Sequence, residues 1–219
     1  MPPSTSSQTH GSRPDARTEP SIYKALDTTK KHIRILCLAP RMRGDPLKGS
    51  SELVSLDKKR PAAYETISYV WGERKPDTDE AITLSGQVLM VPTNTAAALR
   101  QMRRPTTMRR LWIDAVCINQ ADEVERSEQV SLMGTVYRSS RGNLIHLTDN
   151  DAMGRRIVQT VKRIDHEIQL ETDGYRSFRT MIFYENGTFR PHTSGATSDS
   201  EYDTLREMLQ LPWFQWVEL

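Results

Sequence analysis

The spacing of apolar residues predicts extended segments in the first half of the chain. In residues 32–38, apolar side chains recur on one side of an extended chain, as they do in a strand. Residues 64–71 are β-branched and aromatic, so we expect a central strand that brings Trp71 to its end. Residues 81–91 predict a hairpin, because a Ser-Gly pair separates two apolar runs.

The second half of the chain alternates helical and extended patterns. Residues 111–118 form its most apolar window, which favours a strand covered on both faces over a short helix. From Asp122, the predicted N-cap, the apolar spacing becomes helical as far as Tyr137. Further helices are expected over residues 96–102, 152–170 and 202–211, and a short strand over residues 143–147.

Strands that alternate with helices favour an α/β fold over a β-sandwich. We predict an open, mostly parallel sheet flanked by helices, with the hairpin added to it. Residues 1–20 are rich in Ser, Thr, Pro and Gly and nearly lack large apolar side chains, so we expect a disordered arm. We assign residues 21–170 to the α/β domain, 171–200 to a long loop or poorly ordered insertion, and 201–219 to a C-terminal helical segment.

Composition narrows the classes of function. The 219 residues include 30 Lys and Arg and 28 Asp and Glu, so the net charge of +2 offers no global attraction to nucleic acid or anionic lipid. Cys37 and Cys117 each lie in an apolar stretch, which indicates buried thiols in a reducing compartment. The sequence contains neither a membrane-spanning run nor a secretory signal, and we therefore expect a cytoplasmic location, with the nucleus left open.

Several common chemical motifs are missing from the sequence. The GxGxxG, GxxxxGK[ST], HExxH and GxSxG patterns do not occur, and the five histidines lack ligand spacing, so no metal site is expected. Cys117 could form a nucleophile pair with a distant His, although a cysteine flanked by apolar residues more often packs in a core. The basic stretch over residues 100–110 has a simple interpretation as a solvated loop.

Two groups of residues at predicted strand ends could bind a ligand. Trp71-Gly72 follows a strand, where ligands of open α/β sheets bind and an indole can stack on a flat ligand; a core tryptophan beside a turn is the alternative. Asp114 lies in an apolar window and needs a donor or a metal to offset its burial. Asn119 and Gln120 can hydrogen-bond either a ligand or the backbone of the next turn.

A third group begins the helix after Asp122. Glu125 and Gln129 are four residues apart and share one helix face, and Arg126 could pair with Asp122. Ordinary electrostatics at a helix start accounts for the same residues equally well.

Two blocks of the sequence carry a specific likeness. Residues 64–72 read Tyr-Glu-Thr-Ile-Ser-Tyr-Val-Trp-Gly, and residues 111–120 read Leu-Trp-Ile-Asp-Ala-Val-Cys-Ile-Asn-Gln. They resemble the first and second blocks of the fungal heterokaryon incompatibility (HET) domain family, the second nearly residue for residue. The likeness covers roughly residues 33–151. HET modules take part in non-self recognition and programmed cell death in filamentous fungi.

The resemblance implies a fold related to TIR domains, which are doubly wound, flavodoxin-like α/β modules, some of which hydrolyse NAD through a glutamate. NAD is thus the implied substrate, and Glu125 and Glu218 are the candidate catalytic residues. From Pro212 the sequence begins a later family block but then departs from it, which leaves Glu218 beside the chain terminus. His146 and Thr148 stand where the family usually has Trp and Gly. The implied ligand-binding residues are Ser68, Tyr69, Trp71, Gly72, Asp114, Asn119, Gln120, Asp122 and Arg126.

For function, the resemblance implies a signalling module that binds or hydrolyses a nucleotide such as NAD. Its implied partners are copies of itself and other death-signalling or NLR-type proteins, with no specific nucleic acid. Two alternatives stay open: a non-catalytic protein-interaction module, and a truncated, inactive relative of a longer protein.

Overall fold

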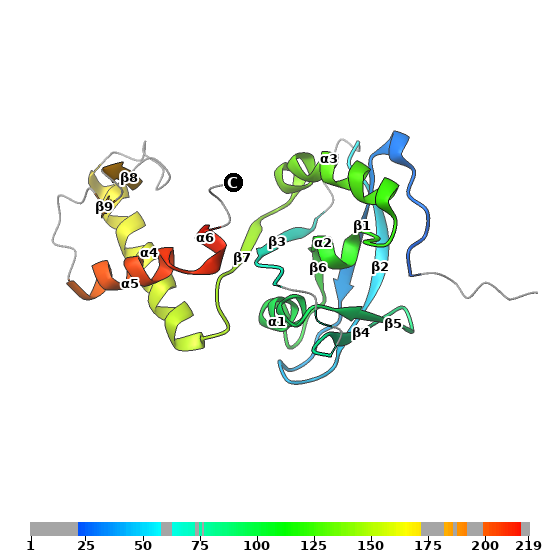
Figure 1. The fold of residues 1–219 in the computed structure, drawn as a ribbon, viewed down its shortest axis with the longest axis horizontal. Coiled ribbons are helices and arrows are strands. Elements are labelled where there is room, and N and C mark those ends of the chain that lie inside the picture. Colours follow the sequence, from blue (N-terminus) through cyan, green and yellow to red (C-terminus); the bar gives the residue numbers. More distant parts are fainter. Residues whose placement is uncertain are drawn as a thin grey trace, which may run out of the picture.

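The computed structural model describes residues 22–57, 63–72, 75, 77–171, 182–185, 188–191 and 199–215. Within them, an open seven-stranded sheet with the order β5-β4-β2-β1-β6-β3-β7 carries helices on its faces (Figure 1). The predicted disordered arm and the candidate Glu218 lie outside the described residues.

The middle of the sheet is built around β1 (His32–Leu38), the predicted first strand. It pairs antiparallel with β2 (Leu47–Ser55) on one side and with β6 (Arg109–Trp112) on the other. The strand predicted to be central is β3 (Glu65–Tyr69), but it is second from the edge of the sheet, where it runs parallel to β6 and to the edge strand β7 (Asn143–His146). Because β3 and β6 run in the same direction, their carboxyl ends reach the same edge of the sheet.

The predicted hairpin consists of β4 (Glu80–Leu84) and β5 (Gln87–Val91), and it joins the sheet through a parallel pairing of β4 with β2. Three of the six pairings in this sheet are parallel, and the predicted α/β fold with an added hairpin is confirmed. Strand β2 was not predicted. Only Leu47 and Val54 of its nine residues are buried, so its apolar pattern is too sparse to indicate a strand.

Two helices cover opposite faces of the sheet (Figure 1). On one face α1 (Thr93–Met102) contacts β2, β3 and β4. On the other face α3 (Glu123–Ser139) packs its Tyr137 ring edge-to-face against Trp112 of β6, with 5.8 Å between the ring centroids. The phenol of Tyr64 also donates a 2.7 Å hydrogen bond to the α3 backbone. Both helices were predicted, and their packing fixes the sheet between them.

The apolar window over residues 111–118 is not one strand, and that prediction was wrong. Strand β6 ends at Trp112, and α2 (Asp114–Cys117) forms a single helical turn whose amides donate to the Ile113 carbonyl. A short buried helix is as apolar as a buried strand, so periodicity does not separate the two. As a result, Asp114 begins a helix at the carboxyl end of β6.

The C-terminal part of the chain packs beside β7 (Figure 1). Here α4 (Asp151–Glu171) and α5 (Asp199–Leu209) were predicted, and α6 (Pro212–Gln215) follows them. Within the stretch predicted as a long loop, β8 (Ile182–Glu185) pairs antiparallel with β9 (Thr188–Pro191). Helices α4 and α5 share an apolar cluster that is separate from the core of the sheet. Its buried residues are Ile157, Ile164, Leu205 and Met208.

Candidate functional site

The carboxyl ends of β3 and β6 bring Trp71 and Asp114 into contact. Trp71 follows β3, Asp114 follows β6, and Trp71 Nε1 donates a hydrogen bond to Asp114 Oδ2 at 2.8 Å. Asp114 Oδ1 accepts from the backbone N–H of Ala115 at 2.7 Å. The indole is thus held at its nitrogen while 41% of the residue stays exposed. Two residues from different sequence blocks therefore form one structural unit.

The phenols of Tyr69, which is buried, and Tyr137, which is half-buried, lie near the Asp114 carboxylate. Burial raises the pKa of Asp114, and the hydrogen bonds from Trp71 and from the Ala115 backbone oppose this rise. Burial, together with the negative charge of Asp114, also raises the pKa of Tyr69 and of Tyr137. Both phenols are therefore neutral at physiological pH and act as hydrogen-bonding groups rather than as bases.

The backbone after Trp71 leaves the strand through a conformation that suits glycine. Gly72 has φ +70°, and a Cβ atom placed there would lie 2.7 Å from Asn94 Nδ2. That amide donates to the Val70 carbonyl at 3.1 Å and so ties α1 to the end of β3. The sequence predicted a helix over residues 96–102 but not which strand end the start of that helix would contact.

Two further contacts close this edge of the sheet. Ser68 Oγ accepts a 3.0 Å hydrogen bond from Trp213 Nε1, so α6 reaches the end of β3. The Tyr69 hydroxyl shares a 2.8 Å hydrogen bond with Thr95 Oγ1 of α1. Sequence reasoning missed Thr95 and Trp213, because residues so distant in the chain carry no local signal of their contact with β3.

Asp122 is the N-cap of α3, as predicted. Its Oδ1 accepts from two backbone N–H groups in the first turn, at 3.1 and 3.0 Å. The suggested partnership of Arg126 with Asp122 is not what the structure shows, since Arg126 Nη1 donates to the Gln120 carbonyl at 3.4 Å. Because the Asp122 carboxylate already accepts from the backbone, the Arg126 guanidinium donates to a different acceptor. These two residues shape the turn between α2 and α3.

Asn119 and Gln120 also contact the backbone of this turn. Asn119 Oδ1 accepts from the Ala121 N–H at 3.3 Å, and Gln120 Nε2 donates to the Asp114 carbonyl at 3.0 Å. Of the residues singled out for ligand binding, Ser68, Tyr69, Trp71, Gly72 and Asp114 therefore gather at one edge. Gln120 lies at the same edge, where it hydrogen-bonds the backbone of Asp114.

Glu125, a candidate catalytic residue, forms a buried ion pair with Arg34 of β1. Its two carboxylate oxygens contact the two terminal guanidinium nitrogens at 2.5 and 2.9 Å, and Oε1 also accepts from the Asn119 N–H at 2.7 Å. The Arg34 and Glu125 side chains are only 2% and 11% exposed. Gln129 lies on the same helix face and donates to the His32 carbonyl. Both residues therefore join α3 to β1.

Other chemistry-bearing side chains are also buried. Both cysteines are free and buried, as predicted, and burial raises the pKa of Cys117 to about 12, which suits a packed thiol rather than a nucleophile. Burial lowers the pKa of His146, whose Nε2 lies 3.4 Å from Asp149 Oδ1. In the described part of the chain, no three His, Cys, Asp or Glu side chains gather as metal ligands, and no helix is long and apolar enough to cross a membrane.

The raised pKa of Asp114 predicts a specific pH dependence of stability. A carboxyl group with a higher pKa in the folded state stabilises the protein below its unfolded pKa, and this contribution is lost as the pH rises through the folded pKa. We therefore expect Asp114→Asn to gain stability relative to the native protein as the pH rises between about 3 and 7. Urea unfolding at several pH values measures this difference.

The control for this experiment is Asp77→Asn, because Asp77 is exposed in a turn. Its difference from the native protein should change little over the same pH range. A difference for Asp114→Asn that stays constant with pH would show that the Asp114 carboxylate is not penalised by burial.

The site and fold define an α/β domain in which two sequence blocks meet at one edge of the sheet. Residues 64–217 match the family described as heterokaryon incompatibility protein (HET), and this chain belongs to that family. It is similar to heterokaryon incompatibility protein 6, OR allele, of Neurospora crassa, with 28% identity over 155 residues. The aligned part is 65% of this chain but only 22% of that relative. No solved structure matches the chain.

Proposed function

We propose that this chain acts in fungal heterokaryon incompatibility and that its Trp71–Asp114 edge binds a nucleotide-sized planar ligand, with NAD as the candidate. Membership of the HET family and the name of the Neurospora relative support the first part. The 2.8 Å hydrogen bond between Trp71 and Asp114 is the observation that supports the second.

The exposed indole of Trp71 offers a planar ligand an aromatic surface at this edge. The hydrogen bond to Asp114 restricts rotation of the indole, and stacking of a base on an aromatic side chain contributes about 1–3 kcal/mol. The Asp114 carboxylate already accepts hydrogen bonds from Trp71 and from the Ala115 backbone, and a carboxylate has about four acceptor positions, so it can also accept from a ribose hydroxyl. NAD carries two flat rings and several ribose hydroxyls, so it offers both kinds of group.

A non-catalytic signalling module is the second candidate, and the state of Glu125 favours it. Hydrolysis through Glu125 would need its carboxylate within hydrogen-bond reach of the ligand, whereas Glu125 is engaged with Arg34 and the Asn119 backbone. In this reading the ligand, or self-association, controls recruitment of death-signalling or NLR-type partners in the cytoplasm. Incubating the concentrated protein with NAD separates the two candidates. Cleavage that Asp114→Asn abolishes without loss of fold would exclude the non-catalytic module, and binding without cleavage would support it.

Expression of this chain in a fungal host with a cell-death readout tests the proposed function. Trp71→Ala removes the stacking surface and should abolish cell death, whereas Trp71→Phe keeps a flat ring without the Nε1–H donor and should retain part of it. Val88→Ala, which changes an exposed apolar side chain on β5, serves as the control and should behave like the native chain. Full cell death from Trp71→Ala at equal protein level would contradict the proposal.

A further inference from the structure

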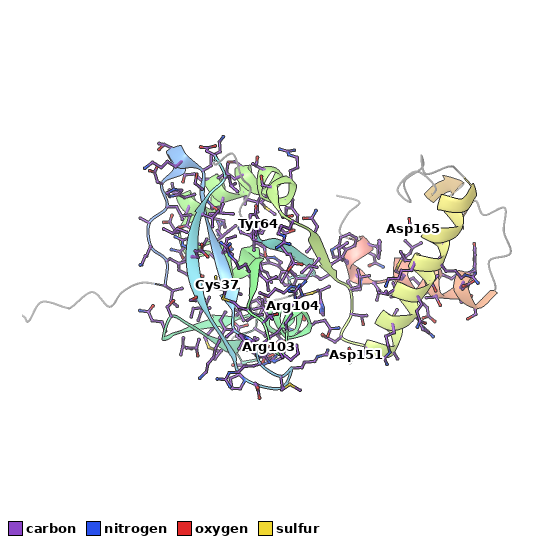
Figure 2. The ribbon with its side chains drawn as sticks, turned by 180° about the vertical axis from the view of Figure 1, so that it is seen from behind. Cys37, Tyr64, Arg103, Arg104, Asp151 and Asp165 are labelled. Atoms are coloured by element: carbon purple, nitrogen blue, oxygen red, sulfur yellow. The ribbon has the colours of Figure 1, made fainter. Side chains whose placement is uncertain are left out.

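A cavity of about 350 Å³ lies at the end of β3 opposite the Trp71–Asp114 edge. Three connections in the chain converge on it. They are the start of β3, the segment that links α1 to β6, and the segment that links α3 to β7. Figure 2 labels Tyr64 and Arg104, which come from the first and second of these connections. The lining residues are Ala63, Tyr64, Glu65, Arg104, Met108, Arg109, Arg110 and Arg141.

Positive charge exceeds negative charge in this cavity. Four arginines line it against one glutamate, Glu65. Arg109 takes both oxygens of that glutamate, with Nε to Oε2 at 2.7 Å and Nη2 to Oε1 at 2.9 Å. Arg104 remains 51% exposed and is 3.9 Å from Glu65, beyond hydrogen-bonding distance. Arg109 therefore uses both oxygens of the one lining carboxylate, and Arg110 pairs with Glu52 outside the lining, which leaves Arg104 and Arg141 as the excess positive charge.

Two more arginines of the cavity retain donor capacity. Arg110 contacts Glu52 through Nη2 at 2.9 Å, but its buried Nε–H has no hydrogen-bond partner within the described residues. Arg141 is exposed, and its backbone N–H is anchored to the Tyr64 carbonyl at 2.8 Å. This anchor holds Arg141 at the rim of the cavity.

We propose that this cavity is an anion site for a diphosphate group, either free or part of a nucleotide. Guanidinium groups match phosphate oxygens with paired donors, and one further carboxylate would not balance the excess charge. The net charge of only +2 on the whole chain argues against a long polyanion such as duplex DNA, which needs an extended basic surface. The site does not depend on the proposed role of Trp71, because it lies at the other end of β3.

Titration calorimetry of the purified chain with inorganic pyrophosphate tests the proposal. We expect saturable binding that Arg104→Gln combined with Arg141→Gln weakens at least roughly tenfold, since both substitutions remove charged hydrogen-bond donors. Arg138→Gln combined with Arg155→Gln removes the same charge from exposed positions elsewhere and should leave the affinity within about twofold. Trp71→Ala should also leave it unchanged. ADP that binds as tightly as pyrophosphate would assign the site to nucleotides, and weaker binding of ADP would assign it to the free anion.

Absence of saturable pyrophosphate binding at millimolar concentration would overturn the inference. Equal weakening in the two double variants would overturn it as well, because the attraction would then be a general effect of charge. Duplex DNA that binds more tightly than pyrophosphate through the same two arginines would replace the small anion with a macromolecule. If circular dichroism shows that Arg104→Gln combined with Arg141→Gln is unfolded, the single variant Arg104→Gln replaces it. A pyrophosphate affinity of that variant within about twofold of the native value overturns the proposal.

Discussion

Replacing Glu125 with alanine is expected to lower the free energy of unfolding by about 3–5 kcal/mol, the cost of removing one partner from a buried ion pair. Arg34 would then keep a buried positive charge without its carboxylate. Its remaining acceptors are the carbonyls of Lys24 and Cys117, which cannot neutralise that charge. The Asn119 N–H would also lose its acceptor. Urea denaturation measures the loss, and the free energy of unfolding should depend on urea concentration with the same slope in both proteins.

The matched control is Glu123→Ala, because Glu123 is an exposed acid in the same first turn of α3. It removes the same favourable interaction with the helix dipole but no buried partner, so we expect a loss within about 1 kcal/mol. Arg34→Met combined with Glu125→Leu should recover much of the stability lost in Glu125→Ala, since no unpaired charge remains. Similar losses from Glu125→Ala and Glu123→Ala would mean that the buried pair contributes little.

Replacing Trp112 with alanine is expected to cost roughly 3–5 kcal/mol, the range for large aromatic side chains in a core. Trp112 is 0% exposed and packs its ring against Tyr137, so its removal leaves a cavity between β6 and α3. Trp71→Ala offers a comparison within the same protein. Trp71 is 41% exposed, and we expect a loss of no more than about 1 kcal/mol. Thermal or urea unfolding of both variants provides the measurement.

Trp112→Phe separates packing from hydrogen bonding. Trp112 Nε1 is buried without a hydrogen-bond partner among the described residues, so phenylalanine keeps most of the ring and removes an unsatisfied donor. We expect this variant to lose less than half of what Trp112→Ala loses. If Trp112→Ala is no less stable than Trp71→Ala, then β6 and α3 are not held together by this contact.

Local patterns were sufficient for the elements that their own residues define. The β-branched run that ends at Trp71 formed the expected strand, and Asp122 caps the expected helix because capping depends on residues two and three positions away. Strand β2 and helix α2 were not indicated by such patterns. The sparse apolar residues of β2 are held by pairing with β1, and the single apolar turn after Trp112 is too short to show a period that separates it from a strand.

The candidate site was predictable only in part for the same reason. Trp71 could be singled out because it ends a strong strand pattern, and Asp114 because a carboxylate stands in an apolar window. Parallel pairing of β3 with β6 then places both at one edge. The partner of Glu125 could not be identified, since Arg34 lies 91 residues away and alternates with apolar residues in β1. A carboxylate that resembled a catalytic group in the sequence is therefore an ion-pair partner in the fold.

The joint ligand site at Trp71 and Asp114 can be tested most directly by recording the indole N–H resonances of the native chain during a titration with NAD. Trp71→Phe identifies the Trp71 resonance. We expect that resonance to shift in a saturable way, Trp112 to remain unaffected, and Asp114→Asn to weaken the response roughly tenfold through loss of a charged hydrogen bond. A Trp71 resonance that does not move at millimolar NAD, or that moves equally in Asp114→Asn, would contradict a ligand site built on this pair.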